Sequence, residues 1–305
     1  MTPAPNASSS PPAVAPLWPG LLLAGAGAIA FSGKAIIVKL AYRHGVDAVT
    51  LIMYRMLFAL PLFLALTWWA GRGQPALTAR DWRVVTGLGF SGYYLASFLD
   101  FAGLQYISAS LERLILYLNP TLVLLLGVVM FRQRVGWRQL LALLVSYCGV
   151  LLVFGQELGV QGPQAALGAA LVLGSAVSYA VYLVLSGAEV RRLGALRLTG
   201  LATSVACGLC IAQFLILRPL SAAVVAPAVI WLSLLNATLC TFAPVLMVMM
   251  AIERIGATLT AQTGMIGPVS TIAMGAVLLG EPFSAWIVVG TALVLVGVWL
   301  LARAR

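Results

Sequence analysis

One long stretch of this chain occurs twice. Residues 104–152 align without a gap on residues 252–300, which lie 148 positions later in the sequence. Leucine matches are common in so apolar a chain, but Pro120 also falls on Pro268, and proline constrains the backbone. Self-similarity at a fixed period is the signature of a repeat architecture. We therefore expect two copies of one unit, each ending in two hydrophobic helices joined by a short polar turn.

The composition indicates that lipid is the main solvent of this chain. Hydrophobic residues make up 62% of the sequence and charged residues only 9%, against about 25% charged residues in soluble domains. Apolar segments recur at the length of about 20 residues that a helix needs to cross a bilayer. These segments are Leu17–Leu40, Ala48–Ala70, Val84–Leu104, Ile107–Phe131, Trp137–Phe154, Ala165–Ser186, Leu198–Leu217, Ile230–Ile252, Ile255–Leu279 and Ser284–Ala302. The predicted fold is an all-α membrane protein with ten transmembrane helices.

The helices divide into two halves of five within one membrane domain. The first half covers residues 17–155 and the second covers 163–303, after a Pro/Ser/Ala-rich segment, 1–16, that we expect to be a disordered cytoplasmic tail. A unit with an odd number of crossings meets its copy upside down, so equivalent helices run in opposite directions. Such inverted repeats are typical of secondary transporters, which hold their substrate near the midplane between the halves. The pattern predicts alternating access through a central cavity.

Lysine and arginine in the short loops predict the orientation. With the N-terminus inside, the opposite side carries only Arg43 and Arg218. The cytoplasmic loops and tail carry Arg72, Arg80, Arg83, Arg132, Arg134, Arg138, Arg191, Arg192, Arg197, Arg254, Arg303 and Arg305. The formal net charge of +10 thus follows from topology and does not indicate nucleic acid binding. We expect a bacterial inner membrane protein with both termini in the cytoplasm.

Polar residues within the predicted helices indicate where a pathway runs, because lipid-facing polar groups cost free energy. The candidate substrate-binding residues are Lys34, Tyr93, Tyr94, Ser97, Tyr117, Asn119, Tyr179, Tyr182, Asn236 and Gln262. Asp100 and Glu112 are the carboxylates available inside the membrane for coupling to protons. Pro120 and Pro268 are candidate paired hinges, although static kinks explain them equally well.

Several of these residues also have a structural interpretation. Small polar residues stabilise helix packing, and tyrosines are common at the membrane–water interface of membrane proteins. The neighbours Glu112 and Arg113 are interpreted as interface anchors, because they lie near a predicted helix end. Lys34 is deeper and indicates a water-filled cavity or an acidic partner. The fifth and tenth helices carry few polar residues, so we expect them to pack outside the pathway as scaffold or as a homodimer contact.

Three short motifs stand out along the chain. They are residues 30–39 followed by Tyr54-Arg55, the segment Leu118-Asn119-Pro120, and residues 279–283 with Gly290 and Gly297 behind them. Together these motifs resemble the EamA branch of the drug/metabolite transporter superfamily. The resemblance implies ten helices in two inverted five-helix repeats and the export or exchange of small metabolites. Bacterial relatives include exporters of amino acids, aromatic ones among them. The chain departs from the family at Arg132-Gln133, where Gly-Glu is common, whereas the second copy keeps Gly280-Glu281.

The sequence therefore predicts an exporter of small amphipathic metabolites, foremost amino acids, with a small-molecule substrate and the lipid bilayer as its partners. A proton-coupled multidrug or nucleotide-sugar carrier of the same superfamily is the alternative, and a channel is a remote one. We expect no enzyme activity, no cofactor and no metal, because His44 is the only histidine and lies in a loop. The four cysteines fall in apolar runs and are expected to be reduced thiols that serve packing.

Overall fold

The computed structural model of the chain describes residues 17–132 and 136–303, and every regular element within them is helical. The predicted tail 1–16 and the turn residues Gln133 and Arg134 lie outside these described residues. The α-helices are α1 (Trp18–Tyr42), α2 (Ala48–Gly71), α3 (Ala79–Gly89), α4 (Ala96–Gly103), α5 (Ala109–Leu116), α6 (Asn119–Phe131), α7 (Trp137–Gln161), α8 (Gln164–Leu193), α9 (Ala195–Leu217), α10 (Pro227–Ala237), α11 (Ala243–Thr263), α12 (Ile266–Met274) and α13 (Ala285–Arg303). Three π-helical segments, η1 (Phe90–Leu95), η3 (Thr238–Phe242) and η4 (Gly275–Leu279), and the 3-10 turn η2 (Leu220–Ala223) complete the described fold.

Eight helices within the described residues are long and apolar enough to cross a membrane. They are Trp18–Tyr42, Ala48–Gly71, Ala109–Met130, Trp137–Gly159, Gln164–Gly187, Ala195–Leu217, Pro227–Ile255 and Ala285–Arg303. Two predicted spans do not meet these criteria. The third is helical from α3 through η1 to α4, but its tyrosines and Asp100 make it more polar than the others. The ninth is shortened to an apolar helix over Ile266–Leu279, so the count of ten stays a prediction.

The helix break that the sequence predicts after Ile252 is wrong, because the chain turns at a later position. Helix α11 continues across Glu253 to Thr263, and the chain turns at Gly264 and Met265 instead. A charged pair within an otherwise apolar run suggested a loop. In the structure the Arg254 guanidinium donates to the carbonyl of Met250 one turn earlier, at 3.1 Å, so the helix accommodates these charges at its exposed side.

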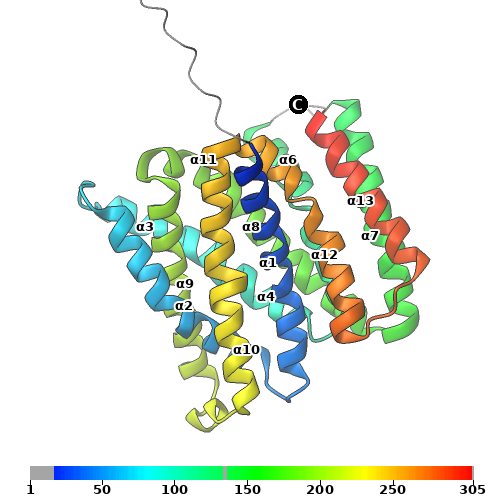
Figure 1. Cartoon of the computed structure of the whole chain (residues 1–305), viewed down its shortest axis with the longest axis horizontal. Helices are drawn as coiled ribbons and strands as arrows, with labels where there is room; N and C mark the ends of the chain where they lie inside the picture. The colour runs from blue at the N-terminus through cyan, green and yellow to red at the C-terminus, as the bar shows by residue number, and fades with distance from the viewer. Residues whose placement is uncertain (1–16, 133–135, 304–305) are drawn as a thin grey trace, which may run out of the picture.

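Equivalent helices of the two copies pack on each other. A Cβ atom added to Gly149 of α7 would lie 2.6 Å from the carbonyl oxygen of Gly290 in α13. A Cβ added to Gly297 would lie 2.8 Å from the carbonyl oxygen of Ala142. These two contacts are the same contact with the copies exchanged, because both pairs are related by the shift of 148 residues. The pairing requires α7 and α13 to run antiparallel, and they lie side by side at one edge of the bundle in Figure 1.

The two copies also share an irregularity that the sequence comparison did not reveal. The π-helical segments η1 and η3 begin at Phe90 and Thr238, which are 148 positions apart. A π-helical turn holds an extra residue in the helix and is common at functional sites. Both segments reach the interior, since Tyr93 of η1 and Thr241 of η3 line the same cavity. The duplication therefore extends upstream of residue 104 in structure.

The bundle has two ends that the following description uses. Helix α1 begins and α13 ends at the upper end in Figure 1, which we call the proximal end. The opposite end, which we call the distal end, carries the turn after α1. Residues of the turns after α4 and η4 line one hollow together with that turn. In the interior, Cys207 and Cys210 of α9 pack fully buried in an apolar cluster beside Met56. Both are free thiols, as the sequence predicts.

Candidate functional site

A buried ion cluster lies where α1, α4 and α5 meet. The Lys34 ammonium lies 2.5 Å from Asp100 Oδ2 and 3.0 Å from Glu112 Oε1. These three side chains, which we call the central triad, are 8%, 3% and 0% exposed. Burying charges carries a large desolvation cost, which close pairing or a ligand must offset. Ionisable groups at such depth in a membrane protein indicate a functional site by default.

Two arginines lie beside the central triad without an acidic partner. Arg55 Nε donates to Thr241 Oγ1 and Arg113 Nη2 donates to Ser32 Oγ, both at 3.0 Å. Each arginine is 6% exposed. Among the ion pairs of the described residues, none involves either guanidinium. Both cations are thus held in the interior by neutral hydroxyl groups.

Lys34, Asp100 and the two arginines line a cavity of about 310 Å³ at the centre of the bundle. Its described lining comes from both copies and combines aromatic rings with charged and hydroxyl groups. The lining residues are Phe31, Lys34, Arg55, Met56, Phe63, Gly92, Tyr93, Ala96, Ser97, Asp100, Arg113, Leu116, Tyr117, Asn119, Ser175, Tyr179, Thr203, Thr241 and Val245. None of these residues belongs to α7 or α13, so the two helices expected outside the pathway contribute nothing to its described lining.

Two helix breaks face each other beside this cavity. The first copy breaks at Tyr117, between α5 and α6, and the second breaks at Gly264, between α11 and α12. The Tyr117 hydroxyl donates to the carbonyl oxygen of Gly264 and so joins the two breaks. A Cβ on Gly267 would lie 2.8 Å from both the Tyr117 hydroxyl and Arg113 Nη2, so glycine permits this close approach.

The paired prolines belong to these breaks. Pro120 lies in the first turn of α6 and Pro268 in the first turn of α12. The sequence placed both prolines inside longer helices, as hinges or kinks. In the first turn of a helix the missing N–H has no intrahelical partner to lose, so proline there costs little. Each proline follows an interruption of the helix rather than bending a continuous one.

Most of the predicted site residues line the central cavity, but Tyr94, Glu112, Tyr182 and Asn236 do not. Lys34, Tyr93, Ser97, Asp100, Tyr117, Asn119 and Tyr179 are lining residues. Tyr182 is buried behind them, with its hydroxyl 3.2 Å from that of Tyr93. Tyr94 packs against Phe90 and lies outside the lining, and Asn236 is buried without reaching it. The side chain of Gln262 lies outside the described residues.

The interpretation of Glu112 and Arg113 as interface anchors is wrong. Both are buried in the interior, Glu112 completely and Arg113 with 6% exposure. Their closeness to a predicted helix end was misleading, because α5 is buried from Ala109 to Ile115. Arg55 was also missed as a lining residue. Its position within a long apolar run was the available signal, since an arginine there requires a polar cavity.

A second hollow, of about 770 Å³, lies at the distal end. Here the Glu281 carboxylate, from the turn before α13, accepts hydrogen bonds from the backbone N–H of Ala109 at 2.8 Å and the hydroxyl of Ser110 at 3.0 Å. A carboxylate at a helix N-terminus is favourable because the N–H groups there lack intrahelical partners. We call this contact the Glu281 latch. It fastens the second copy to the first helix turn of α5.

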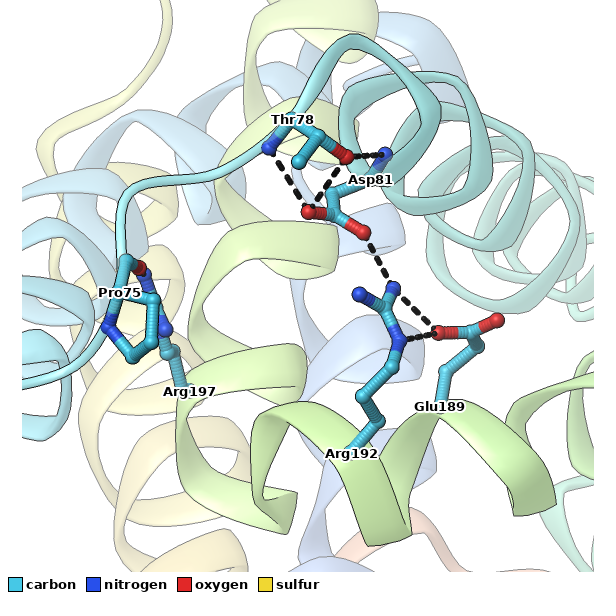
Figure 2. Close-up of polar contacts among 6 residues, drawn as sticks. All are labelled: Pro75, Thr78, Asp81, Glu189, Arg192 and Arg197. Atoms are coloured by element: carbon cyan, nitrogen blue, oxygen red, sulfur yellow. Dashed lines mark hydrogen bonds and ion pairs between the residues drawn. The ribbon is translucent and has the colours of Figure 1, made fainter.

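The proximal end carries no such latch in the described residues. The position equivalent to Glu281 is Gln133, which lies outside them. The equivalent of the α4–α5 break is residues 252–256, where α11 continues without interruption and therefore offers no helix N-terminus. Instead, Figure 2 shows an ion cluster between α3 and α8. Arg192 donates to Asp81 Oδ1 and, at 2.6 Å, to Glu189 Oε2.

This cluster of Arg192, Asp81 and Glu189, which we call the proximal triad, faces solvent. The Arg192 side chain is 44% exposed, against 4% for Asp81 and 12% for Glu189. Asp81 also forms the capping box of α3 with Thr78 (Figure 2). Hydrogen bonds from Arg192 and Thr78 hold the pKa of the Asp81 carboxyl well below its usual range. The proximal triad therefore ties two helices together at the surface.

Comparison with known proteins identifies the family. The EamA-like transporter family matches residues 18–155 and again 166–303. The chain belongs to the EamA-like transporter family. It is 30% identical to an uncharacterized transporter of Bacillus subtilis (strain 168), YcbK, over 87% of this chain and 86% of that protein. An uncharacterized transporter of Archaeoglobus fulgidus is 27% identical over 51% of this chain and 53% of its own.

A solved crystal structure supports the fold of this EamA-like protein. It matches with a TM-score of 0.61 at 18% identity, covering 93% of this chain and 97% of the other. At this identity the likeness concerns the fold alone. Together with the eight membrane-length helices, the family assignment makes this chain a multi-pass membrane transporter whose substrate the relatives do not specify.

Proposed function

We propose that this EamA-like transporter exports small amphipathic metabolites, foremost amino acids including aromatic ones, by alternating access through the central cavity. The observation that carries the proposal is the cavity itself. It lies between the two copies, is lined by rings such as Phe31 and Tyr179, and holds buried charges of both signs. Aromatic walls suit a flat apolar body, and paired charges suit the zwitterionic end of an amino acid.

Exchange in liposomes tests this function. The purified protein is reconstituted, loaded with unlabelled phenylalanine and supplied with labelled phenylalanine outside. Saturable accumulation of label is expected, with competition by other amino acids. A variant with Arg192→Met at the surface should exchange like wild type, because that residue lies outside the cavity lining. Absence of exchange across all common amino acids contradicts the proposal, and unitary current steps in place of saturable exchange favour a channel.

The membrane arrangement belongs to the same proposal. We place ten spans in two inverted repeats in a bacterial inner membrane, with the proximal end and both termini in the cytoplasm. The antiparallel contact of α7 with α13 supports the inversion. Single cysteines at His44, at the distal end, and Arg191, at the proximal end, test it in a Cys148→Ser background. An impermeant reagent outside the cell should label the His44 position alone, and labelling of both positions contradicts the scheme.

Proton coupling is the second candidate function, and one observation favours it. Asp100 Oδ1 and Glu112 Oε2 are buried and accept no hydrogen bond in the described residues. A carboxylate with an unused buried oxygen is suited to take up a proton. An imposed pH gradient should then drive substrate accumulation by the wild-type protein. Asp100→Asn or Glu112→Gln should abolish this gradient-driven accumulation, while exchange without a gradient continues. Flux that ignores the gradient in wild type contradicts coupling.

A further inference from the structure

The positive and negative charges at the central cavity are unequal in number. Lys34, Arg55 and Arg113 supply three cations, whereas Asp100 and Glu112 supply two carboxylates. Each of the five residues is at most 6% exposed, so bulk water screens their charges poorly. Within the described residues, the site therefore carries one positive charge more than its own acids neutralise. A site of this kind favours an anionic ligand.

The carboxylates of Asp100 and Glu112 both form ion pairs with the same cation, Lys34. Lys34 lies within 3.0 Å of Asp100 and of Glu112, so its ammonium faces two carboxylates. A third carboxylate, brought by a substrate, would be repelled there. The sequence predicts Lys34 as a substrate-binding residue. In the structure Lys34 organises the acids of the site, and a different group must meet a substrate anion.

Arg55 and Arg113 have hydrogen-bonding capacity that nothing in the described protein uses. The Nη1 group of Arg55 and the Nε group of Arg113 are buried and donate to no acceptor. A charged donor left unsatisfied in the interior costs free energy, and an acceptor on a ligand removes that cost. Both side chains line the cavity, so a ligand within it reaches them.

Aromatic rings hold both guanidinium groups in place. The Arg55 guanidinium lies 5.1 Å from the centre of the Phe101 ring. The Arg113 guanidinium lies 5.4 Å from the Phe31 ring and 5.5 Å from the Tyr117 ring. Cation–π contacts of this kind restrict the guanidinium without occupying its N–H groups. A planar guanidinium group held in this way is well suited to a carboxylate, which it binds through two parallel hydrogen bonds.

We propose that Arg55 and Arg113 bind the carboxylate of the transported molecule, which is an organic acid with a small apolar or aromatic body. This inference rests on the proposed transport through the same cavity and specifies its substrate class. The unused Oδ1 of Asp100 accepts the ammonium of an amino acid. That contact is not required, so acids without an ammonium group also bind. The amide or ester of the same acid lacks the anion and binds more weakly.

A matched ligand series tests the inference on wild-type protein in detergent. The probes are phenylalanine, phenylalaninamide, phenethylamine and 3-phenylpropionate, with calorimetry and thermal melting as the measurements. Phenylalanine and 3-phenylpropionate should bind and raise the melting temperature. Phenylalaninamide and phenethylamine should bind at least about tenfold more weakly, because they offer no anion to the arginines. Equal binding of acid and amide, or tighter binding of phenyl phosphate than of either acid, overturns the inference.

Substitutions then assign the contact to the two arginines. Arg55→Met and Arg113→Met should each lower the affinity for 3-phenylpropionate about tenfold or more. Neither should lower the melting temperature of the empty protein greatly, because no acid loses an ion-pair partner. Arg192→Met serves as the matched control and should bind as wild type. Retained affinity in both cavity variants contradicts the inference, and the ligand series still decides if a variant fails to fold.

The two proposals fail in distinguishable ways. Binding of the acids in detergent without exchange in liposomes contradicts the transport function and leaves the carboxylate site standing. Saturable exchange of phenylalaninamide or phenethylamine at the rate of phenylalanine supports transport but removes the carboxylate site.

Discussion

The central triad and the proximal triad contain the same set of charges in opposite surroundings. In each, one cation bridges two carboxylates, Lys34 in the interior and Arg192 at the surface. The Lys34 side chain is 8% exposed and that of Arg192 is 44% exposed. Water therefore shares in solvating the proximal triad, whereas the central triad depends on its own members. The comparison teaches that burial, and not the number of ion pairs, decides what a charge cluster does.

The largest effect is expected for Lys34→Met. This change leaves two carboxylates close together in the interior without their cation. We expect the free energy of unfolding to fall by about 3–5 kcal/mol, as for other broken buried pairs, and exchange activity to be lost. Thermal melting in detergent and liposome exchange measure the two effects.

A compensated variant sharpens the same test. Combining Lys34→Met with Asp100→Asn and Glu112→Gln removes all three charges together. This variant should regain most of the stability while remaining inactive, because a neutral replacement leaves no uncompensated charge. If the triple variant is as unstable as Lys34→Met alone, packing at this position matters more than charge.

A smaller effect is expected for Glu112→Gln. Lys34 keeps Asp100 at 2.5 Å, so the variant loses one of two acidic partners. The cost should be roughly 1–3 kcal/mol, the range for a buried polar group that loses its partner. The melting temperature should lie between those of wild type and Lys34→Met. A variant more stable than wild type would indicate that the second carboxylate is held at a cost to stability for the sake of function.

At the surface, Arg192→Met should lower the melting temperature only slightly and leave exchange intact. Solvent already screens the Arg192 charge, and exposed ion pairs contribute little to stability. The small difference from wild type should shrink as salt is raised, since salt screens exposed charges more than buried ones. A loss comparable with that of Lys34→Met would break the comparison between the two triads.

The smallest effect concerns pH at Asp81. Its pKa is lowered in the folded protein by hydrogen bonds from Arg192 and Thr78, so its stabilisation is present above the unfolded pKa of about 3.9. That stabilisation is lost as the pH falls through the lower, folded pKa. The melting temperature of wild type should exceed that of Asp81→Asn at neutral pH, and the gap should close in acid. A gap that is constant with pH contradicts the ion-pair origin.

The sequence predicts the architecture well where the two copies agree. The shift of 148 residues finds the matched prolines and the matched glycines of α7 and α13. It does not reveal where the helices of the two copies end at different positions. The first copy turns between α4 and α5, while the second continues as α11 to Thr263, because hydrophobicity alone does not distinguish a bent helix from a broken one.

Residues of the cavity lining were predicted where a charge lies deep in a long helix, as with Lys34. They were missed where burial depends on tertiary structure, as with Arg113, whose short helix is covered by its neighbours from its first residue. Tyr182 shares a helix face with Tyr179, yet only Tyr179 lines the cavity. Helical spacing places residues on one face, but the neighbouring helix η1 decides how much of that face is covered.

The Glu281 latch has a consequence for the energetics of the working cycle. In an ideally symmetric duplicate, the form open at one end and the form open at the other would have equal free energy. Here Glu281 binds the start of α5 at the distal end, and the second copy has no matching helix start. In a protein that alternates as proposed, the two forms are unequally populated at rest. Opening the distal end in such a cycle would break the hydrogen bonds that Glu281 accepts from Ala109 and Ser110, so the Glu281 latch opposes opening at that end.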